Sequence, residues 1–154
     1  MKALLQRVTQ ASVSIDGQTV GRIGPGLVVF LGVADGDTEK DTAYLAEKTI
    51  GLRIFPDADG KFNLSALDTK GELLVISQFT LLADARKGRR PSFTKAAAPD
   101  KAKTLYEQYV TLAVNSGLKV ATGRFQEHML VEILNDGPVT IILDSREKFA
   151  VIDN

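Results

Sequence analysis

A continuous apolar run, Leu27 to Val33, restricts the fold of this chain more than any other segment. Its residues are rich in β-branched side chains, and Gly24-Pro25-Gly26 marks a turn directly before it. The run is far shorter than the roughly 20 residues that are needed to cross a bilayer. It is typical of a strand with both faces buried, so we expect it to lie in the core of a sheet.

Alternating and apolar segments predict further strands around this core. Val13 and Ile15 alternate with serines before Asp16-Gly17, a dipeptide that favours a tight turn into a second strand ending near Ile23. Later strands are expected at residues 52–55, 72–82, 118–121, 128–134 and 139–144.

Two helices are expected between these strands. Thr38 stands three residues before Asp41 in an approximate capping box, and apolar residues recur at helical spacing over residues 39–50. A second amphipathic pattern runs through Leu105 and Tyr109 to the stop signal at residues 115–117. This order of elements predicts one α+β domain over residues 1–154 with a mainly antiparallel sheet.

Composition excludes several classes of function. Nineteen Lys and Arg residues balance nineteen Asp and Glu residues, so any contact with nucleic acid has to be local. There is no cysteine, and a lone His128 cannot form a dedicated zinc site, so we expect no metal and no other cofactor. The first residues lack the features of a signal peptide, and we expect a cytoplasmic protein without membrane contact.

The pentapeptide Ser77-Gln78-Phe79-Thr80-Leu81 is the first candidate site, at the end of a predicted strand. Thr80 offers a hydroxyl, Gln78 an amide and Phe79 a ring on which a base could stack. Backbone N–H groups of this segment could stabilise an oxyanion. The alternative is an ordinary strand end with Phe79 in the core.

The hexapeptide Asn135-Asp136-Gly137-Pro138-Val139-Thr140 is the second candidate, between two apolar strands. A hairpin turn is the simple interpretation of these residue types. Gly137-Pro138 is also a kind of peptide bond for which the cis form is accessible, at about 0.5–1 kcal/mol against 2.5–4 elsewhere. A cis bond would direct two successive carbonyls to one side.

Four basic side chains in the predicted loop 83–99 form the third candidate: Arg86, Lys87, Arg89 and Arg90. Such a cluster could fix an RNA backbone without reading its sequence, although a solvated loop is the simpler interpretation. His128 titrates near neutrality, but it lies opposite the apolar face of its predicted strand. We therefore expect a surface or packing role for it.

Two of these segments together resemble the signatures of the D-aminoacyl-tRNA deacylase family, SQFTL at residues 77–81 and NDGPVT at residues 135–140. The likeness covers nearly the whole chain and extends to residues 6–8, 87–93, 122–125 and Met129. Gln126-Glu127-His128 departs from the family, whose members often have small residues there. No function is assigned to that tripeptide.

The resemblance implies a homodimer with a barrel-like core, helices outside it and an active site at the subunit interface. It also implies that a cis Gly137-Pro138 peptide, braced by Arg7, projects into the partner's pocket. There its two carbonyls would meet the amino group of the substrate and leave no room for an L side chain.

The reaction implied by the resemblance is hydrolysis of the ester of D-aminoacyl-tRNA, a quality control of translation; activity on glycyl-tRNA stays open. Gln78, Phe79 and Thr80 are the implied catalytic positions, and Ser77 and Met129 join Gly137 and Pro138 in binding the substrate. The 2′-hydroxyl of the terminal ribose would assist hydrolysis. An activated ester needs positioning and oxyanion stabilisation more than a strong base, which suits a chain without a catalytic triad.

Three alternatives stay open at this point. Thr80 could act as a covalent nucleophile in the same reaction. The chain could be a non-catalytic RNA-binding module that uses the basic loop and Phe79, although zero net charge and few aromatic residues disfavour this. It could also be a Thr80-dependent hydrolase of ordinary L-esters, which a chiral pair of substrates would reveal.

Overall fold

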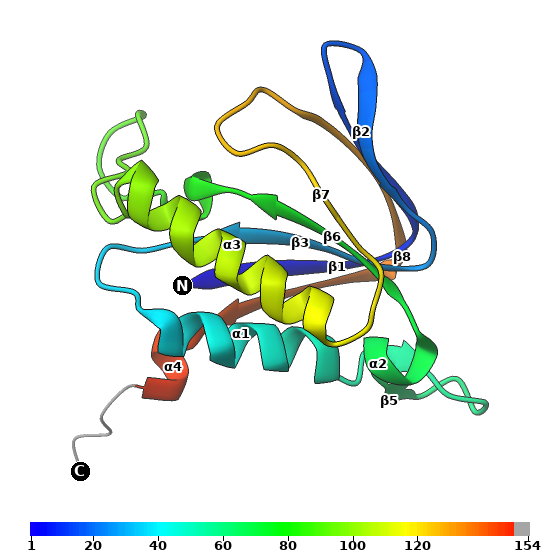
Figure 1. Cartoon of the computed structure of the whole chain (residues 1–154). Coiled ribbons are helices and arrows are strands. Elements are labelled where there is room, and N and C mark those ends of the chain that lie inside the picture. Colours follow the sequence, from blue (N-terminus) through cyan, green and yellow to red (C-terminus); the bar gives the residue numbers. More distant parts are fainter. Residues whose placement is uncertain (150–154) are drawn as a thin grey trace.

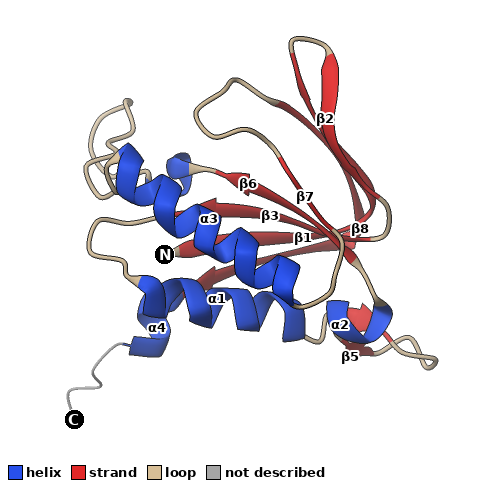
Figure 2. Cartoon of the chain, in the orientation of Figure 1, coloured by secondary structure: helices blue, strands red, loops and turns tan. Residues whose placement is uncertain are grey.

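The computed structural model describes residues 1–149 and shows a curved sheet with its two long helices side by side on one face (Figure 1). The described elements, coloured by type in Figure 2, are β1 (Lys2–Ile15), β2 (Gln18–Ile23), β3 (Gly26–Gly32), α1 (Glu39–Gly51), β4 (Phe55–Pro56), β5 (Phe62–Leu64), α2 (Ala66–Thr69), β6 (Glu72–Ser77), η1 (Phe79–Leu82), α3 (Pro99–Asn115), β7 (Val120–Thr122), β8 (Leu130–Asp144) and α4 (Ser145–Phe149). The predicted α+β class is confirmed. None of the helices among these residues combines the length and the apolar character needed to cross a membrane.

The sheet is built around β1. Its first half pairs antiparallel with β3, its second half pairs with β2, and β8 pairs along its opposite edge. From β3 the sheet continues through β6 to β7. β2 then approaches β7 so closely that a Cβ on Gly21 would lie 2.8 Å from the carbonyl oxygen of Thr122. The sheet is therefore nearly closed and barrel-like.

Two strand pairs differ from the mainly antiparallel prediction. β3 and β6 run parallel, and so do β6 and β7. The first pair is connected through α1 and the second through α3, and parallel neighbours require such a crossover. The sheet is therefore mixed. The sequence pattern locates the helices, but it does not show which strands become neighbours in the sheet, so the parallel pairs were not predicted.

β3 confirms the interpretation of the apolar run. Leu27, Val29 and Leu31 belong to a core between the sheet and the helices. Val28 belongs with Leu74 to a second core inside the barrel. The two cores lie on opposite faces of β3, and burial of each of these side chains contributes about 1.5–3 kcal/mol. No position in the run is therefore left for a polar residue.

Local signals set several element ends as predicted. Asp16 and Gly17 adopt positive φ angles of 49° and 78° and join β1 to β2 in a tight hairpin. Thr38 caps α1, and the capping box with Asp41 is complete. Gly117, with φ 89°, follows the end of α3.

Other bounds differ from the prediction. The strand expected at 72–82 ends at Ser77, because its pairing with β3 ends at Leu31, and a 3-10 turn follows. The strand expected at 52–55 is reduced to β4, which pairs with β5. The strands expected at 128–134 and 139–144 are one strand, β8. The short elements α2, β5 and α4 were not predicted.

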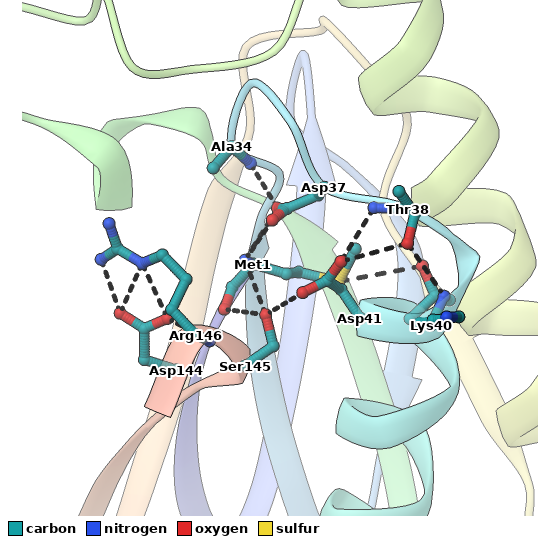
Figure 3. A network of polar contacts seen from close by, with 10 residues as sticks. Met1, Ala34, Asp37, Thr38, Lys40, Asp41, Asp144, Ser145 and Arg146 are labelled. Carbon is teal, nitrogen blue, oxygen red and sulfur yellow. Dashed lines mark hydrogen bonds and ion pairs between the residues drawn. The ribbon is translucent and has the colours of Figure 1, made fainter. Parts of the chain in front are cut away.

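A buried ion pair joins the start of β1 to the loop before α1 (Figure 3). The α-ammonium of Met1 lies 2.8 and 2.7 Å from the two carboxylate oxygens of Asp37 and donates to the hydroxyl of Ser145 at 2.9 Å. Asp37 also accepts from the N–H of Ala34, and Ser145 donates to Asp41 at 2.6 Å. Met1 and Ser145 are fully buried, so this network holds four segments together away from water.

Candidate active site

A cavity of about 630 Å³ opens between the end of β6, the start of α3 and the segment before β8. Ser77, Gln78 and Phe79 line one side of it, and Met129 lines another. Most of the remaining wall is apolar, formed by Phe30, Val33, Ile76, Ala96, Ala97, Pro99, Ala102, Phe125 and Val131. The structure thus brings together four of the residues predicted to bind substrate or to act on it.

The corner between β6 and η1 directs these side chains. The N–H of Gln78 donates to the carbonyl of Leu31 at 2.8 Å, after which the chain leaves the sheet. Gly32 is required beside this corner, since a Cβ there would lie 2.9 Å from the Gln78 carbonyl oxygen. In the turn that follows, the first N–H groups have no partner within the turn itself. These first N–H groups belong to Phe79, which lines the cavity, and to Thr80, which does not.

The side chains of Phe79 and Thr80 have distinct surroundings. Phe79 is 54% exposed and packs edge-on against Phe93, with ring centroids 5.0 Å apart, so the alternative that placed it in the core is wrong. Thr80 is exposed and donates to the amide oxygen of Gln78 at 2.6 Å. An amide oxygen is not a base, so this contact does not activate the Thr80 hydroxyl as a nucleophile.

The tripeptide to which no function was assigned lies at the cavity. Gln126, Glu127 and His128 all line it, and His128 precedes β8 instead of lying on a strand. Gln126 adopts a left-handed φ of 63°, within a bend that returns the chain toward Met129. Glutamine gives no sequence signal for this conformation, because asparagine and glycine are the residues that usually adopt it.

The segment Asn135–Thr140 is a bulge within β8. Gln6 of β1 pairs with Thr140 and Val8 pairs with Asn135, so β8 advances five residues where β1 advances two. Both flanks of the segment run along the same strand in the same direction. The simple interpretation as a hairpin turn between two strands is therefore wrong; turn residues serve here to push a loop out of a continuous strand.

Side chains within the bulge fix its shape. Asn135 accepts from the N–H of Val139 at 2.9 Å and donates to the Thr140 hydroxyl at 2.8 Å. The Gly137-Pro138 peptide is cis, and Gly137 has φ 135°. A Cβ on Gly137 would lie 3.0 Å from the backbone nitrogen of Val139, so glycine is required there for two independent reasons.

Arg7 contacts the bulge from β1. Its side chain is nearly buried, its Nε donates to the Asp136 carbonyl at 3.2 Å, and its Nη1 donates to the Ile54 carbonyl at 2.8 Å. The structure thus places Arg7 beside Gly137, with Nη2 3.4 Å from the position of a Cβ on that glycine. No residue of the bulge lines the cavity, so a single chain keeps these two groups of predicted residues apart.

The basic cluster divides into one paired residue and three others. Arg86 forms a two-point contact with Asp84, at 2.9 and 2.6 Å, and holds the pKa of that carboxyl well below its usual range. Lys87, Arg89 and Arg90 lie exposed in the same loop. The loop that carries the cluster returns at Phe93, whose ring contacts that of Phe79 in the cavity wall.

Comparison with known proteins identifies the family. The family model described as D-Tyr-tRNA(Tyr) deacylase matches residues 4–144. The chain belongs to this family. Its members include proteins named D-aminoacyl-tRNA deacylase from Dehalococcoides mccartyi, 62% identical over 148 residues (96% of this chain, 97% of that protein), and from Thermotoga petrophila, 58% identical over 149 residues (97% and 100%). The resemblance inferred from the two motifs is confirmed.

Two solved structures share the fold of this chain. A structure titled c-Myc DNA Unwinding Element Binding Protein has a TM-score of 0.88 at 38% identity and covers 94% of this chain and 98% of its own. A structure titled as a probable eukaryotic D-amino acid tRNA deacylase has a TM-score of 0.79 at 18% identity, covering 92% and 97%. At that lower identity the likeness concerns the fold alone.

Proposed function

We propose that this chain hydrolyses the ester that joins a D-amino acid to the end of tRNA and spares the L ester. The family match over residues 4–144, with relatives about 60% identical along nearly the full chain, carries this conclusion. The enzyme is a hydrolase of translation proofreading. Whether glycyl-tRNA is a further substrate is decided by the assay below.

The chemistry takes place at the corner between β6 and η1. The ester lies in the cavity with its carbonyl oxygen toward the N–H groups of Phe79 and Thr80, which stabilise the developing oxyanion. The ring of Phe79 and the backbone near Ser77 seat the terminal adenosine, opposite Met129. By family analogy the 2′-hydroxyl of the terminal ribose assists the attack of water. The Thr80 hydroxyl, bound to an amide oxygen, positions Gln78 and forms no covalent adduct.

Selection against L-aminoacyl-tRNA requires a second copy of the chain. The carbonyls of Gly137 and Pro138 enter the partner's cavity, because they do not line the cavity of their own chain. Three apolar side chains on β8 flank the bulge, and each is more than half exposed in the single chain: Leu130, Leu134 and Ile142. A homodimer in which a second copy covers exposed apolar side chains of β8 would carry the bulge across the interface.

The basic loop binds the tRNA backbone. Lys87, Arg89 and Arg90 are exposed in the loop that leads to Phe93, and the Phe93 ring contacts Phe79 of the cavity wall. Their charges can therefore meet phosphates near the end of the acceptor stem. Arg86 contributes less than expected from the sequence, because Asp84 already neutralises it. Recognition of this kind depends on salt and not on sequence.

A matched pair of substrates tests the proposal. Purified protein is incubated with D-tyrosyl-tRNA and L-tyrosyl-tRNA, with glycyl-tRNA as a third substrate, and the release of free amino acid is measured. We expect rapid hydrolysis of the D ester and near-complete sparing of the L ester. Equal rates would indicate an ordinary esterase, and binding without cleavage would indicate an RNA-binding module.

A further inference from the structure

We infer that Phe62, on the β4–β5 hairpin, is a positioning residue for chiral selection: it holds the Arg7 guanidinium, which holds the Gly137-Pro138 bulge. The inference rests on the proposed role of that bulge in rejecting L-aminoacyl-tRNA. Chiral selection would then depend on the β4–β5 hairpin as well as on the bulge, although the two are far apart in sequence.

The Arg7 guanidinium connects two segments of the chain. On one side its Nε reaches the Asp136 carbonyl at 3.2 Å, and the carboxylate of Asp136 lies 3.8 Å away. On the other side its Nη1 reaches the Ile54 carbonyl at 2.8 Å, and its Cζ lies 5.3 Å from the centre of the Phe62 ring. A guanidinium is a rigid planar fork, so the ring beneath it fixes the direction of all its donors together.

Packing alone does not explain Phe62. Its side chain is 55% exposed, and it belongs to neither of the two apolar cores. Leu64, two residues later on the same strand, packs against the core between sheet and helices. The hairpin is thus attached to the fold through Leu64 and through Phe55 of β4, while the Phe62 ring lies beside a charged group.

Hydrogen bonds close the tip of the hairpin that carries the ring. The carboxylate of Asp57 accepts from the N–H groups of Lys61 at 3.0 Å and Asp59 at 2.9 Å and from the Asn63 amide at 3.2 Å. These hydrogen bonds, that from Lys61 foremost, lower the pKa of Asp57. A two-stranded hairpin is marginal by itself, and this closed turn compensates for its shortness.

The test compares variants by the ratio of kcat/KM for D-tyrosyl-tRNA to that for L-tyrosyl-tRNA. Phe62→Leu keeps apolar volume and removes the ring, and we expect the ratio to fall about threefold, as the loss of an exposed cation–π contact predicts. The fall should come from faster L hydrolysis at an unchanged kcat for the D ester. Phe62→Tyr keeps an aromatic ring and should show the wild-type ratio. Leu67→Ala, at an exposed apolar position on α2, is the matched control and should leave it unchanged.

A second variant and the wild-type enzyme separate this inference from the proposed function on which it rests. Gly137→Ala changes the bulge directly and should lower the ratio strongly, because a Cβ there approaches both Val139 and Arg7. A lowered ratio in Gly137→Ala with a wild-type ratio in Phe62→Leu would overturn the role of Phe62 alone. A wild-type enzyme without chiral preference would remove the proposed function, and the inference with it. Equal losses on both esters in Phe62→Leu would assign the ring a purely structural role and overturn the inference.

Discussion

Removing the Asp37 carboxylate should lower the stability of the fold more than removing one partner of an exposed ion pair does. The α-ammonium of Met1 is fully buried, and in Asp37→Ala it would keep only the Ser145 hydroxyl at 2.9 Å, which carries no charge. An uncompensated buried charge costs about 3–5 kcal/mol. The same change leaves the N–H of Ala34 without its acceptor.

The expected loss can be read from thermal unfolding followed by circular dichroism. For a chain of this size each 1 kcal/mol corresponds to about 2–4 °C, so Asp37→Ala should lower Tm by about 6–20 °C. Lys119→Ala is the control, because it removes a 3.4 Å pair with Glu72 whose lysine is mostly exposed, and such pairs contribute about 0–1 kcal/mol. Equal Tm values for the two variants would show that burial of the Met1 ammonium carries no such cost, and the reasoning would be wrong.

Four further outcomes are expected. Thr80→Ala should keep most of its activity on D-tyrosyl-tRNA, whereas near-complete loss, or a trapped aminoacyl adduct on Thr80, would make this hydroxyl the nucleophile. Arg89→Ala combined with Arg90→Ala should weaken binding of whole tRNA, less so at high salt, and barely affect a minimal aminoacyl-adenosine substrate; equal losses on both would contradict phosphate binding. Hydrolysis should survive a chelator, since the chain has no cysteine and one histidine, and rescue by zinc of a chelated, inactive enzyme would contradict this. Burial alone would raise the pKa of Asp41, but hydrogen bonds from Ser145 and Thr38 outweigh it and lower the pKa below its ordinary 3.8. Its contribution is therefore present above that value and lost as the pH falls below it, so Asp41→Asn should flatten the acid side of a plot of Tm against pH; an unchanged acid side would contradict this.

Local chemistry made part of this structure predictable. The apolar run of β3, the Asp16-Gly17 turn and the Thr38 cap each depend on residues close together in sequence, and all three were predicted correctly. The motif at residues 77–81 was also placed correctly at the end of a strand, although that strand is shorter than expected. Its end depends on the length of β3, which lies far away in sequence.

Features that depend on distant partners could not be predicted. The residues of a hairpin turn and of a bulge are of the same types, and only the pairing of both flanks with β1 distinguishes them. The contact of Arg7 with the Ile54 carbonyl likewise arises from the path of the chain and not from any motif. Gln126 adopts a left-handed conformation that helps to bring residues 126–128 to the cavity, and a glutamine does not predict this conformation.

The bulge in β8 also determines where this protein can change length. Adding one residue elsewhere in β8 would turn every following side chain to the opposite face of the sheet and expose part of a core. Between Asn135 and Thr140 the pairing with β1 is already interrupted and resumes on both sides, so an added or removed residue need not shift either flank. A library of loops of different lengths grafted at residues 136–138, with the buried Val139 kept, should therefore fold on an unchanged barrel, which makes this strand a scaffold for presenting new peptides.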